Sequence, residues 1–270
     1  MPAPKLKKAD SELLSVIVPA YKCSTIYKDL QNINHYLQAL NRPYELICVV
    51  DGKASSRDLT RKKAIQARSA NQVKVYYYKQ NQGKGYALRF GMARARGGII
   101  AFIDAGSDLN ARGIGMALEH MKWYNADIII GSKRHKASKV NYPWQRKIPS
   151  FIIQMATRIL YRLNVSDTQT GLKVFRREVL EKVLPRLLVK RFAFDLEILG
   201  VAKRLGYTRI YESPVELIFN FSSTVTYSWG LSFLTDYLAI LYRIYILRYY
   251  DDDHHDIWQE DRQLKLRYHL

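Results

Sequence analysis

Residues 97–108 read Gly-Gly-Ile-Ile-Ala-Phe-Ile-Asp-Ala-Gly-Ser-Asp. The apolar run, set between two glycines and an acidic turn, is typical of a buried β-strand. The strand places Asp104 at its carboxyl end, and Asp108 follows four residues later. Carboxylate oxygens in this position suit a hard divalent cation, which can bridge to a diphosphate. An acidic residue after a strand is also a common helix N-cap, so the string alone leaves both interpretations open.

The pattern of this stretch recurs along the first half of the chain. Short runs rich in β-branched residues lie at 13–18, 44–51, 73–78, 99–104 and 127–131. Segments with helical spacing separate them, at 25–40, 58–68, 85–95 and 111–123. This alternation predicts an α/β fold, with a mostly parallel sheet and helices on both of its faces. In such sheets ligands bind at the carboxyl ends of the strands, so we expect the functional site there.

The chain is strongly basic, with 43 Lys and Arg against 24 Asp and Glu and a formal net charge of +19 over 270 residues. Residues 251–270 hold six acidic and three basic residues, so this acidic tail carries −3 and residues 1–250 carry +22. The excess predicts an anionic partner, which could be a nucleic acid, an acidic membrane surface or a phosphorylated substrate. Hydrophobic residues make up 48% of the chain, which excludes wholesale disorder.

The cysteines and the N-terminus predict a compartment. Cys23 and Cys48 are the only two cysteines, and they form neither a disulfide framework nor a metal-binding spacing. Residues 1–12 form a short polar, Lys-bearing lead-in without the pattern of a signal peptide. We therefore expect a reduced, cytoplasmic setting.

Two amphipathic segments follow residue 131, at 146–165 and 227–250. Apolar residues of the first fall on one helix face, and charged residues are interspersed in both. Asp236 and two arginines interrupt the second segment, so its uncharged runs are too short for a helix that spans a bilayer. Each segment could pack on the core or lie flat in a lipid interface. In so basic a chain we favour the interface, and we predict a membrane-contact segment at 226–250 ahead of the acidic tail.

Two further motifs fall at predicted strand ends. Asn81-Gln82-Gly83-Lys84-Gly85 follows one strand and opens a helix, where glycines would let backbone amides approach a phosphate and Lys84 adds a cation. The spacing does not match a P-loop. Asp51, at the end of the second strand, could accept hydrogen bonds from a nucleobase or ribose, or could cap a turn.

Taken in order, these motifs resemble the family-2 glycosyltransferases, which have the Rossmann-like GT-A fold. The similarity is greatest to the synthases that attach glucose or mannose to a polyprenyl or dolichyl phosphate, and it covers about residues 13–250. The motifs that carry it lie at 15–21, 49–52, 81–85, 97–108, 131–134, 167–176 and 191–197. The resemblance implies a GT-A catalytic domain over residues 13–225, including the segment 146–165.

The resemblance also implies a nucleotide pocket. Its lining would be formed by Pro19, Ala20, Tyr21 and Asp51. Lys84 would lie near the donor. Together with Asp104, these residues make up the predicted donor-binding set.

The acidic metal motif of the family normally reads Asp-x-Asp with a further polar ligand two residues later. Asp104 would begin this motif, but Gly106 replaces the second acid, and Asp108 occupies the position of the further ligand. The resemblance therefore implies Mg²⁺ or Mn²⁺ held by Asp104 and Asp108. Losing one carboxylate should weaken metal binding, because few protein ligands remain. This departure motivates an alternative, a non-catalytic relative that binds nucleotide sugars.

The remaining predicted site residues are charged. Arg134 and Arg146 match family arginines that handle the phosphates of donor and acceptor, although a solvated basic face would contain such residues too. Asp195 and Glu197 fall where the family places an acidic pair near the acceptor. The catalytic set that the resemblance implies is Asp104, Asp108, Arg134, Arg146 and Asp195.

These inferences predict an inverting glycosyltransferase. We expect it to move a hexose from a nucleotide sugar, of the UDP-glucose or GDP-mannose type, to a polyprenyl or dolichyl phosphate. It would act peripherally at the cytoplasmic face of a membrane with an anionic surface. A glycan acceptor is the alternative within the same class. No nucleic-acid-binding module accompanies the charge, so we expect no nucleic-acid partner. The oligomeric state is open, and a homo-oligomer is among the alternatives.

Overall fold

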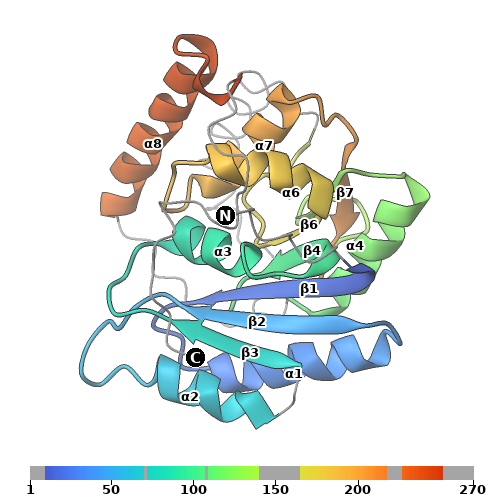
Figure 1. Ribbon diagram of the computed structural model, residues 1–270, viewed down its shortest axis with the longest axis vertical. Helices are drawn as coiled ribbons and strands as arrows, with labels where there is room; N and C mark the ends of the chain where they lie inside the picture. Colours follow the sequence, from blue (N-terminus) through green and yellow to red (C-terminus); the bar gives the residue numbers. More distant parts are fainter. Residues whose placement is uncertain (1–9, 70–71, 107–108, 140–164, 218–226, 252–270) are drawn as a thin grey trace, which may run out of the picture.

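The computed structural model describes residues 10–69, 72–106, 109–139, 165–217 and 227–251. In this part of the chain a seven-stranded sheet forms the centre of the molecule, in the order β3-β2-β1-β4-β6-β5-β7 (Figure 1). The strands are β1 Asp10–Ala20, β2 Tyr44–Val50, β3 Val73–Tyr77, β4 Gly97–Ile103, β5 Ile128–Ser132, β6 Leu172–Arg176 and β7 Ile210–Pro214.

Most neighbouring strands run parallel. β1 pairs with β2 on one side and with β4 on the other, in a register that sets Val16 beside both Leu46 and Ala101. The pairs β2–β3 and β5–β7 are also parallel. The exception is β6, which runs antiparallel to both of its neighbours, β4 and β5. The prediction of an α/β fold with a mostly parallel sheet is thus confirmed.

Helices cover both faces of the sheet, as predicted. One face packs against α1, α2 and α4, and the other against α3, α6, α7 and α8. In the view of Figure 1, α1 and α2 lie below β1 and β2, and α3 lies above them. The helices are α1 Ile26–Ala39, α2 Thr60–Gln66, α3 Lys84–Met92, α4 Arg112–Trp123, α6 Arg177–Val183, α7 Phe194–Arg204 and α8 Tyr227–Tyr245. Short 3₁₀ turns lie at Ala67–Ser69, Leu184–Arg186 and Tyr249–Asp251.

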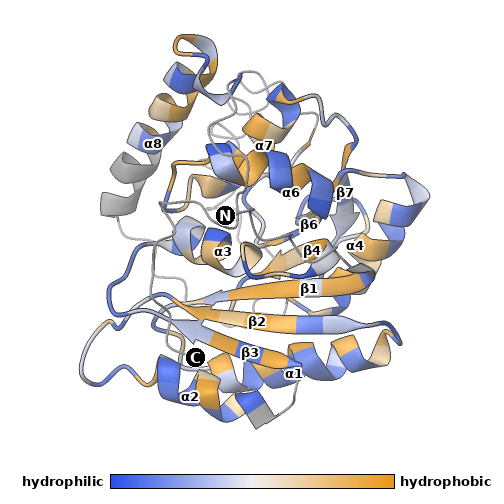
Figure 2. Ribbon diagram, in the orientation of Figure 1, coloured by the Kyte–Doolittle hydropathy of each residue, from blue (hydrophilic) through white to orange (hydrophobic). Residues whose placement is uncertain are grey.

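The two layers follow from the periodicity of the sequence. In β1, Val16 packs into the core on the α1 side and Ile17 into the core on the α3 side, because successive strand residues point to opposite faces. On α1 the buried residues include Ile26, Leu30 and Leu37, whose spacing places them on one helix face. Figure 2 shows apolar residues along most of β1 and β2, and polar residues on much of α1 and α2. The parallel strands are therefore buried on both faces.

All strands and helices predicted before residue 131 are present, with ends within three residues of the predicted ones. Strands β6 and β7 were not predicted from the sequence. Leu-Lys-Val-Phe-Arg in β6 and Ile-Tyr-Glu-Ser-Pro in β7 are short and contain charged residues, so neither has the apolar run of a buried strand. The predicted segment 146–165 lies outside the described residues except for Val165, and the predicted domain boundaries stay predictions.

The last described helix, α8, packs one of its faces on the body of the protein. Its residues Tyr237, Ile240 and Ile244 are buried in the core that α6 and α7 share. Just beyond the helix, the buried Tyr250 donates a hydrogen bond of 2.7 Å from its hydroxyl to Glu197 on α7. In the described part of the chain, no helix combines the length and the apolar character needed to cross a bilayer.

A buried carboxylate ties the strands together at the end of the sheet opposite to the predicted site. Glu45 accepts hydrogen bonds of 2.7 Å from the Ser15 hydroxyl and the Arg96 amide, and forms a 2.7 Å ion pair with Lys74. Burial alone would raise the pKa of Glu45, but the bonds from Lys74, Ser15 and Arg96 outweigh it and hold this pKa below its usual value. The ionised carboxylate therefore stabilises the fold above the unfolded pKa of about 4.3, and this stabilisation is lost as the pH falls through the folded pKa.

Replacing Glu45 by glutamine is expected to lower the free energy of unfolding at pH 7 by about 1–3 kcal/mol, because bonds to a charged group are lost. Between pH 7 and pH 3 the variant should lose less stability than the wild type. Urea denaturation across this pH range measures both effects. Glu119→Gln, at an exposed position on α4, is the control and should leave the free energy of unfolding unchanged. An unaltered acid dependence in Glu45→Gln would contradict this account.

Candidate functional site

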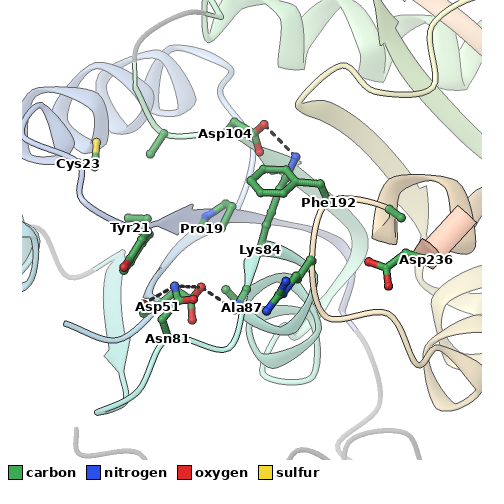
Figure 3. Close-up of a pocket in the computed structure, with 15 residues that line it drawn as sticks. Pro19, Tyr21, Cys23, Asp51, Asn81, Lys84, Ala87, Asp104, Phe192 and Asp236 are labelled. Carbon is green, nitrogen blue, oxygen red and sulfur yellow. Dashed lines mark hydrogen bonds and ion pairs between the residues drawn. The ribbon is translucent and has the colours of Figure 1, made fainter. Parts of the chain in front are cut away.

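The carboxyl ends of β1, β2 and β4 and the start of α3 surround a cavity of about 560 Å³. Segment 191–193 and α8 close it on the other side, and Figure 3 shows Tyr21 and Asp51 opposite Phe192 and Asp236. The lining residues are Pro19, Ala20, Tyr21, Cys23, Asp51, Asn81, Gly83, Lys84, Ala87, Asp104, Ala105, Arg191, Phe192, Ala193 and Asp236. The cavity thus lies at the edge of the sheet where the strand pattern predicts a ligand.

The whole predicted donor-binding set lines this cavity. It comprises Pro19, Ala20, Tyr21, Asp51, Lys84 and Asp104. Asp195 is 1% exposed and lies behind the wall, in contact with Lys84. Arg134 is exposed on the loop after β5 and is not among the lining residues. Asp108 and Arg146 lie outside the described residues.

Asp51 organises the loop that leads into α3. Its carboxylate accepts hydrogen bonds from the Tyr78 hydroxyl at 2.7 Å and from the Asn81 amide group at 2.8 Å. The backbone amides of Gln82 and Gly83 donate to the same carboxylate at 2.7 and 2.9 Å. Asp51 therefore caps this turn, one of the two uses predicted for it, and it lines the cavity; its use for a nucleobase or ribose stays a prediction.

The glycines beside Lys84 are required by close packing. A Cβ at Gly85 would lie 2.6 Å from the Cβ of Phe194 on α7, and one at Gly83 would overlap the carbonyl of Lys190. Gly83 has a φ of +103°, a backbone conformation that other residues rarely adopt. Because its amide donates to Asp51, this amide is engaged within the protein. The motif thus brings α3 against the segment that enters α7.

Lys84 is the first residue of α3, and its ammonium lies between two carboxylates. The Nζ atom is 2.9 Å from Oδ2 of Asp104 and 3.1 Å from Oδ2 of Asp195. Burial alone would lower the pKa of Lys84, but the two aspartates raise it above its usual value. Lys84 is therefore a permanent cation at the wall of the cavity.

Asp104 stands at the end of β4, and backbone contacts hold it in place. Its amide donates a 2.8 Å hydrogen bond to the carbonyl of Gly171, the residue before β6. A Cβ at Gly171 would overlap the Asp104 carboxylate, so only glycine fits there. Asp104 Oδ2 binds Lys84, whereas its buried Oδ1 has no hydrogen-bond partner among the described residues. An unpaired, buried carboxylate oxygen is costly unless another group, such as a cation, binds it.

The predicted metal site is only partly described. No group of three or more His, Cys, Asp and Glu side chains that could hold a metal occurs within the described ranges, and Asp108 lies outside them. Gly106, at the position of the second acid, has a φ of +114° and donates its amide to Asp29 at 2.9 Å. The described residues thus fit a cation that binds Asp104 Oδ1 and takes its other ligands from outside the described residues.

Behind Lys84 lies a second buried ion pair. The ammonium of Lys173, on β6, is 2.6 Å from Oδ1 of Asp195 and donates to the carbonyl of Thr170 at 2.9 Å. Burial alone would raise the pKa of Asp195, but Lys173 and Lys84 together hold it below its usual value. Asp195 is therefore an ionised carboxylate shared between two lysines.

Glu197, the other acid of the predicted acceptor pair, is completely buried. It accepts hydrogen bonds from the backbone amides of Leu188 and Val189, at 3.0 and 2.9 Å, and from the Tyr250 hydroxyl. Burial raises the pKa of Glu197 above its usual value. Its contacts tie the end of α8 to the chain that leads into segment 191–193.

Comparison with known proteins identifies the family. A sequence model described as Glycosyl transferase family 2 matches residues 15–184, which is more than half of the chain. The chain belongs to glycosyl transferase family 2. The matched range contains every residue of the predicted donor-binding set and ends ahead of Asp195.

Curated relatives of this family member are dolichyl-phosphate beta-glucosyltransferases. The protein from Drosophila melanogaster is 31% identical over 218 residues, which cover 75% of this chain and 66% of the relative. The Dictyostelium discoideum protein is 27% identical, with 73% and 64% covered. The human protein is 28% identical, with 74% and 66% covered. The match thus spans slightly less than two thirds of the length of each of these relatives.

Solved structures share the fold of this family member. Glucosyl-3-phosphoglycerate synthase from Mycobacterium tuberculosis, in complex with Mn²⁺, UDP and phosphoglyceric acid, superposes with a TM-score of 0.64 at 18% identity. That match covers 86% of this chain and 78% of the synthase. Mannosyl-3-phosphoglycerate synthase from Rubrobacter xylanophilus gives 0.64 at 14% identity, with 86% and 74% covered.

Several residues at the site of this family-2 chain were not predicted from the sequence. Phe192 and Asp236 line the cavity, and Lys173 holds Asp195 from behind. Two of them carry a signal in hindsight: Asp236 is an acid within an apolar-aromatic helix, and Lys173 is a charge within a buried strand. Placing them required the pairing of β6 with β4 and the packing of α8, which no local pattern specifies.

Proposed function

We propose that the chain transfers glucose from a nucleotide-glucose donor to dolichyl phosphate. The observation that carries the proposal is the pairing of Lys84 with Asp104, in a cavity that Tyr21 and Asp51 also line. A binding site for a nucleoside diphosphate needs a cation, a carboxylate oxygen without another partner and an exposed aromatic ring. The relatives named dolichyl-phosphate beta-glucosyltransferases support both the sugar and the acceptor.

The proposed reaction is one direct displacement. A phosphate oxygen of dolichyl phosphate attacks the anomeric carbon of glucose and forms the new bond. The bond from that carbon to the donor diphosphate breaks, and its electron pair leaves with the nucleoside diphosphate, so the configuration inverts. The phosphate monoester has a second pKa near 6 and is largely dianionic at neutral pH, so it needs no strong base.

The residues of the site would then neutralise phosphate charge. Lys84 would bind the donor diphosphate, whose charge grows as the bond to glucose breaks. Asp104, with the predicted ligand Asp108, would hold Mg²⁺ or Mn²⁺, which supplies Lewis-acid stabilisation of the diphosphate. Arg134 and Arg146 are proposed to bind phosphates of the donor and acceptor.

A donor screen tests the proposal. Purified protein is incubated with radiolabelled UDP-glucose or GDP-mannose, dolichyl phosphate and Mn²⁺, and the lipid product is extracted into organic solvent. We expect label from UDP-glucose in the lipid fraction. If only GDP-mannose labelled the lipid, the proposed donor would be wrong. If sugar were transferred only to a glycan, the proposed acceptor would be wrong. Nucleotide binding without any transfer would favour a non-catalytic relative, the alternative that Gly106 motivates.

We also propose that α8 lies on the membrane. Its outward stripe, defined as Leu234, Leu238, Tyr242 and Tyr245, is apolar and 48–55% exposed, while the opposite face is buried. An apolar helix face beside a cavity for a lipid phosphate would keep the polyprenyl tail in the bilayer as the headgroup enters. The cytoplasmic face stays a prediction.

Changing Leu234 and Leu238 together to glutamate is expected to lower the partition into anionic liposomes at least tenfold, because two exposed leucines lose their burial in lipid. Deleting α8 would be a poor test, because its other face belongs to the core. Liposome sedimentation measures binding, and UDP titration should be unchanged. The matched control changes Met116 and Trp123, exposed on α4, to glutamate. Equal binding by wild type and the α8 variant would rule out this contact.

A further inference from the structure

Four charges of alternating sign form a chain behind the cavity. In contact order they are Asp104, Lys84, Asp195 and Lys173, with ion-pair distances of 2.9, 3.1 and 2.6 Å. The exposed fraction of their side chains falls in the same order, from 38% to 12%, 2% and 0%. The chain therefore starts at the cavity and ends in the core, as Figure 3 shows for its outer pair.

The inner pair does not reach the cavity. Neither Asp195 nor Lys173 is among the lining residues, and each residue as a whole is at most 1% exposed. Among the described residues, the hydrogen bonds and ion pairs of this inner pair reach the cavity through Lys84. Both lysine ammoniums also lie near the ring of Phe102, at 5.6 and 5.2 Å from its centroid. The inner pair therefore acts on a ligand through the position of Lys84 and through the net charge of the four groups.

We propose that Asp195 and Lys173 are positioning residues. They hold the Lys84 ammonium beside the donor diphosphate and leave the positive charge of Lys84 available to the diphosphate. Asp195 anchors Lys84 from behind, and Lys173 cancels the charge of Asp195. The inference rests on the proposed function only in taking a nucleoside diphosphate as the ligand.

The reason lies in the charge balance. Burial lowers the pKa of Lys173, and the ionised Asp195 at 2.6 Å opposes this shift and keeps the ammonium charged. With all four groups ionised, the four side chains have no net charge. Without Lys173, Asp195 would be neutralised by Lys84 alone, and a net charge of −1 would face an anionic ligand. Without the charge of Asp195, the net charge would be +1. If the buried pair served only to stabilise the fold, replacing it by apolar residues would cost little stability. Single replacements of Lys173 and of Asp195 would then not shift ligand affinity in opposite directions.

The test is a calorimetric titration of the full chain with UDP in the presence of Mn²⁺, without acceptor. Lys173→Met is expected to weaken UDP binding about tenfold, the effect of one charge roughly 10 Å away at an effective dielectric constant near 20. Asp195→Asn is expected to tighten UDP binding by a similar factor, since it removes a negative charge. The double variant should return to within about threefold of the wild type, because the opposing charges cancel.

The rate of transfer distinguishes the positioning role of Asp195 from the effect of its charge. In Asp195→Asn, Lys84 loses its anchor, so kcat for transfer should fall about tenfold or more although UDP binds more tightly. The matched controls are Lys74→Met and Glu45→Gln, which break the ion pair at the opposite end of the sheet. They should reduce thermal stability and leave UDP affinity unchanged.

The outcomes are distinct. Shifts of UDP affinity in the same direction for Lys173→Met and Asp195→Asn, or no shift in either, would overturn the inference. If Lys173→Met does not fold, Asp195→Asn and the double variant decide. UDP binding without glucose transfer by the wild type would reject the proposed function, and the titrations would still decide the positioning role. If the wild type bound neither UDP nor GDP, both proposals would fail.

Discussion

Replacing Asp104 by alanine is expected to lower the rate of glucose transfer by about two to three orders of magnitude, the usual cost of losing one preorganised electrostatic group. The carboxylate has two uses at the cavity. Its Oδ2 holds Lys84 at 2.9 Å, and its buried Oδ1 has no partner among the described residues and is proposed to bind the metal. Alanine removes both, so Mn²⁺-dependent UDP binding should weaken along with turnover.

The control for this variant is Glu119→Gln, which removes an exposed carboxylate from α4 on the other face of the sheet. It should transfer glucose at the rate of the wild type. Transfer and Mn²⁺-dependent UDP binding are measured for both variants, together with their melting temperatures. Normal transfer by Asp104→Ala would remove Asp104 from the site and with it the proposed metal position.

Replacing Gly171 by alanine is expected to reduce transfer about a hundredfold, although the side chain gains only one methyl group and carries no charge. The new Cβ would overlap the carboxylate of Asp104, and even the Asp104 Cβ would be only 2.8 Å away. Either Asp104 or the start of β6 must move, and both positions set the contacts of Lys84. Kinetics with UDP-glucose and dolichyl phosphate measure the loss.

Gly206→Ala, in the turn after α7, separates this effect from stability. Gly206 has a φ of +91°, but a Cβ there would meet nothing within 4 Å. The control should therefore lose about 1 kcal/mol of stability through backbone strain and keep its activity. Equal activity of Gly171→Ala and the wild type would show that Asp104 need not keep its position.

The first half of the fold follows from local sequence. β1 to β5 and α1 to α4 could be predicted because parallel strands buried on both faces are continuous apolar runs, and the helices between them have a clear apolar face. β6 could not be predicted in this way, since Lys173 interrupts it. That lysine is tolerated in a buried strand because Asp195, from α7, neutralises it at 2.6 Å. The partner is 22 residues away in sequence, beyond the reach of any local pattern.

The candidate site was predictable to a similar extent. Residues at the ends of predicted strands, such as Tyr21, Asp51 and Asp104, converge because parallel strands end at one edge of the sheet. Asp195 was singled out from its motif, but its burial behind Lys84 follows from how α7 packs on α3. Asp236 was interpreted only as a charge that interrupts an apolar segment. It lines the cavity because α8 packs on α7, which is a tertiary contact.

The antiparallel strand β6 also constrains the order in which the molecule can be assembled. It lies between β4 and β5, although both of these strands precede it in the chain. Until Leu172–Arg176 has been synthesised, each of the two would present an unpaired edge, and such edges readily pair with strands of other chains. A nascent chain that stops short of β6 therefore holds the four strands β3, β2, β1 and β4 and a separate β5, whose other neighbour β7 also comes later in the chain. The same five residues that join β4 to β5 also carry Lys173 into the core, where Asp195 of the later helix α7 neutralises it.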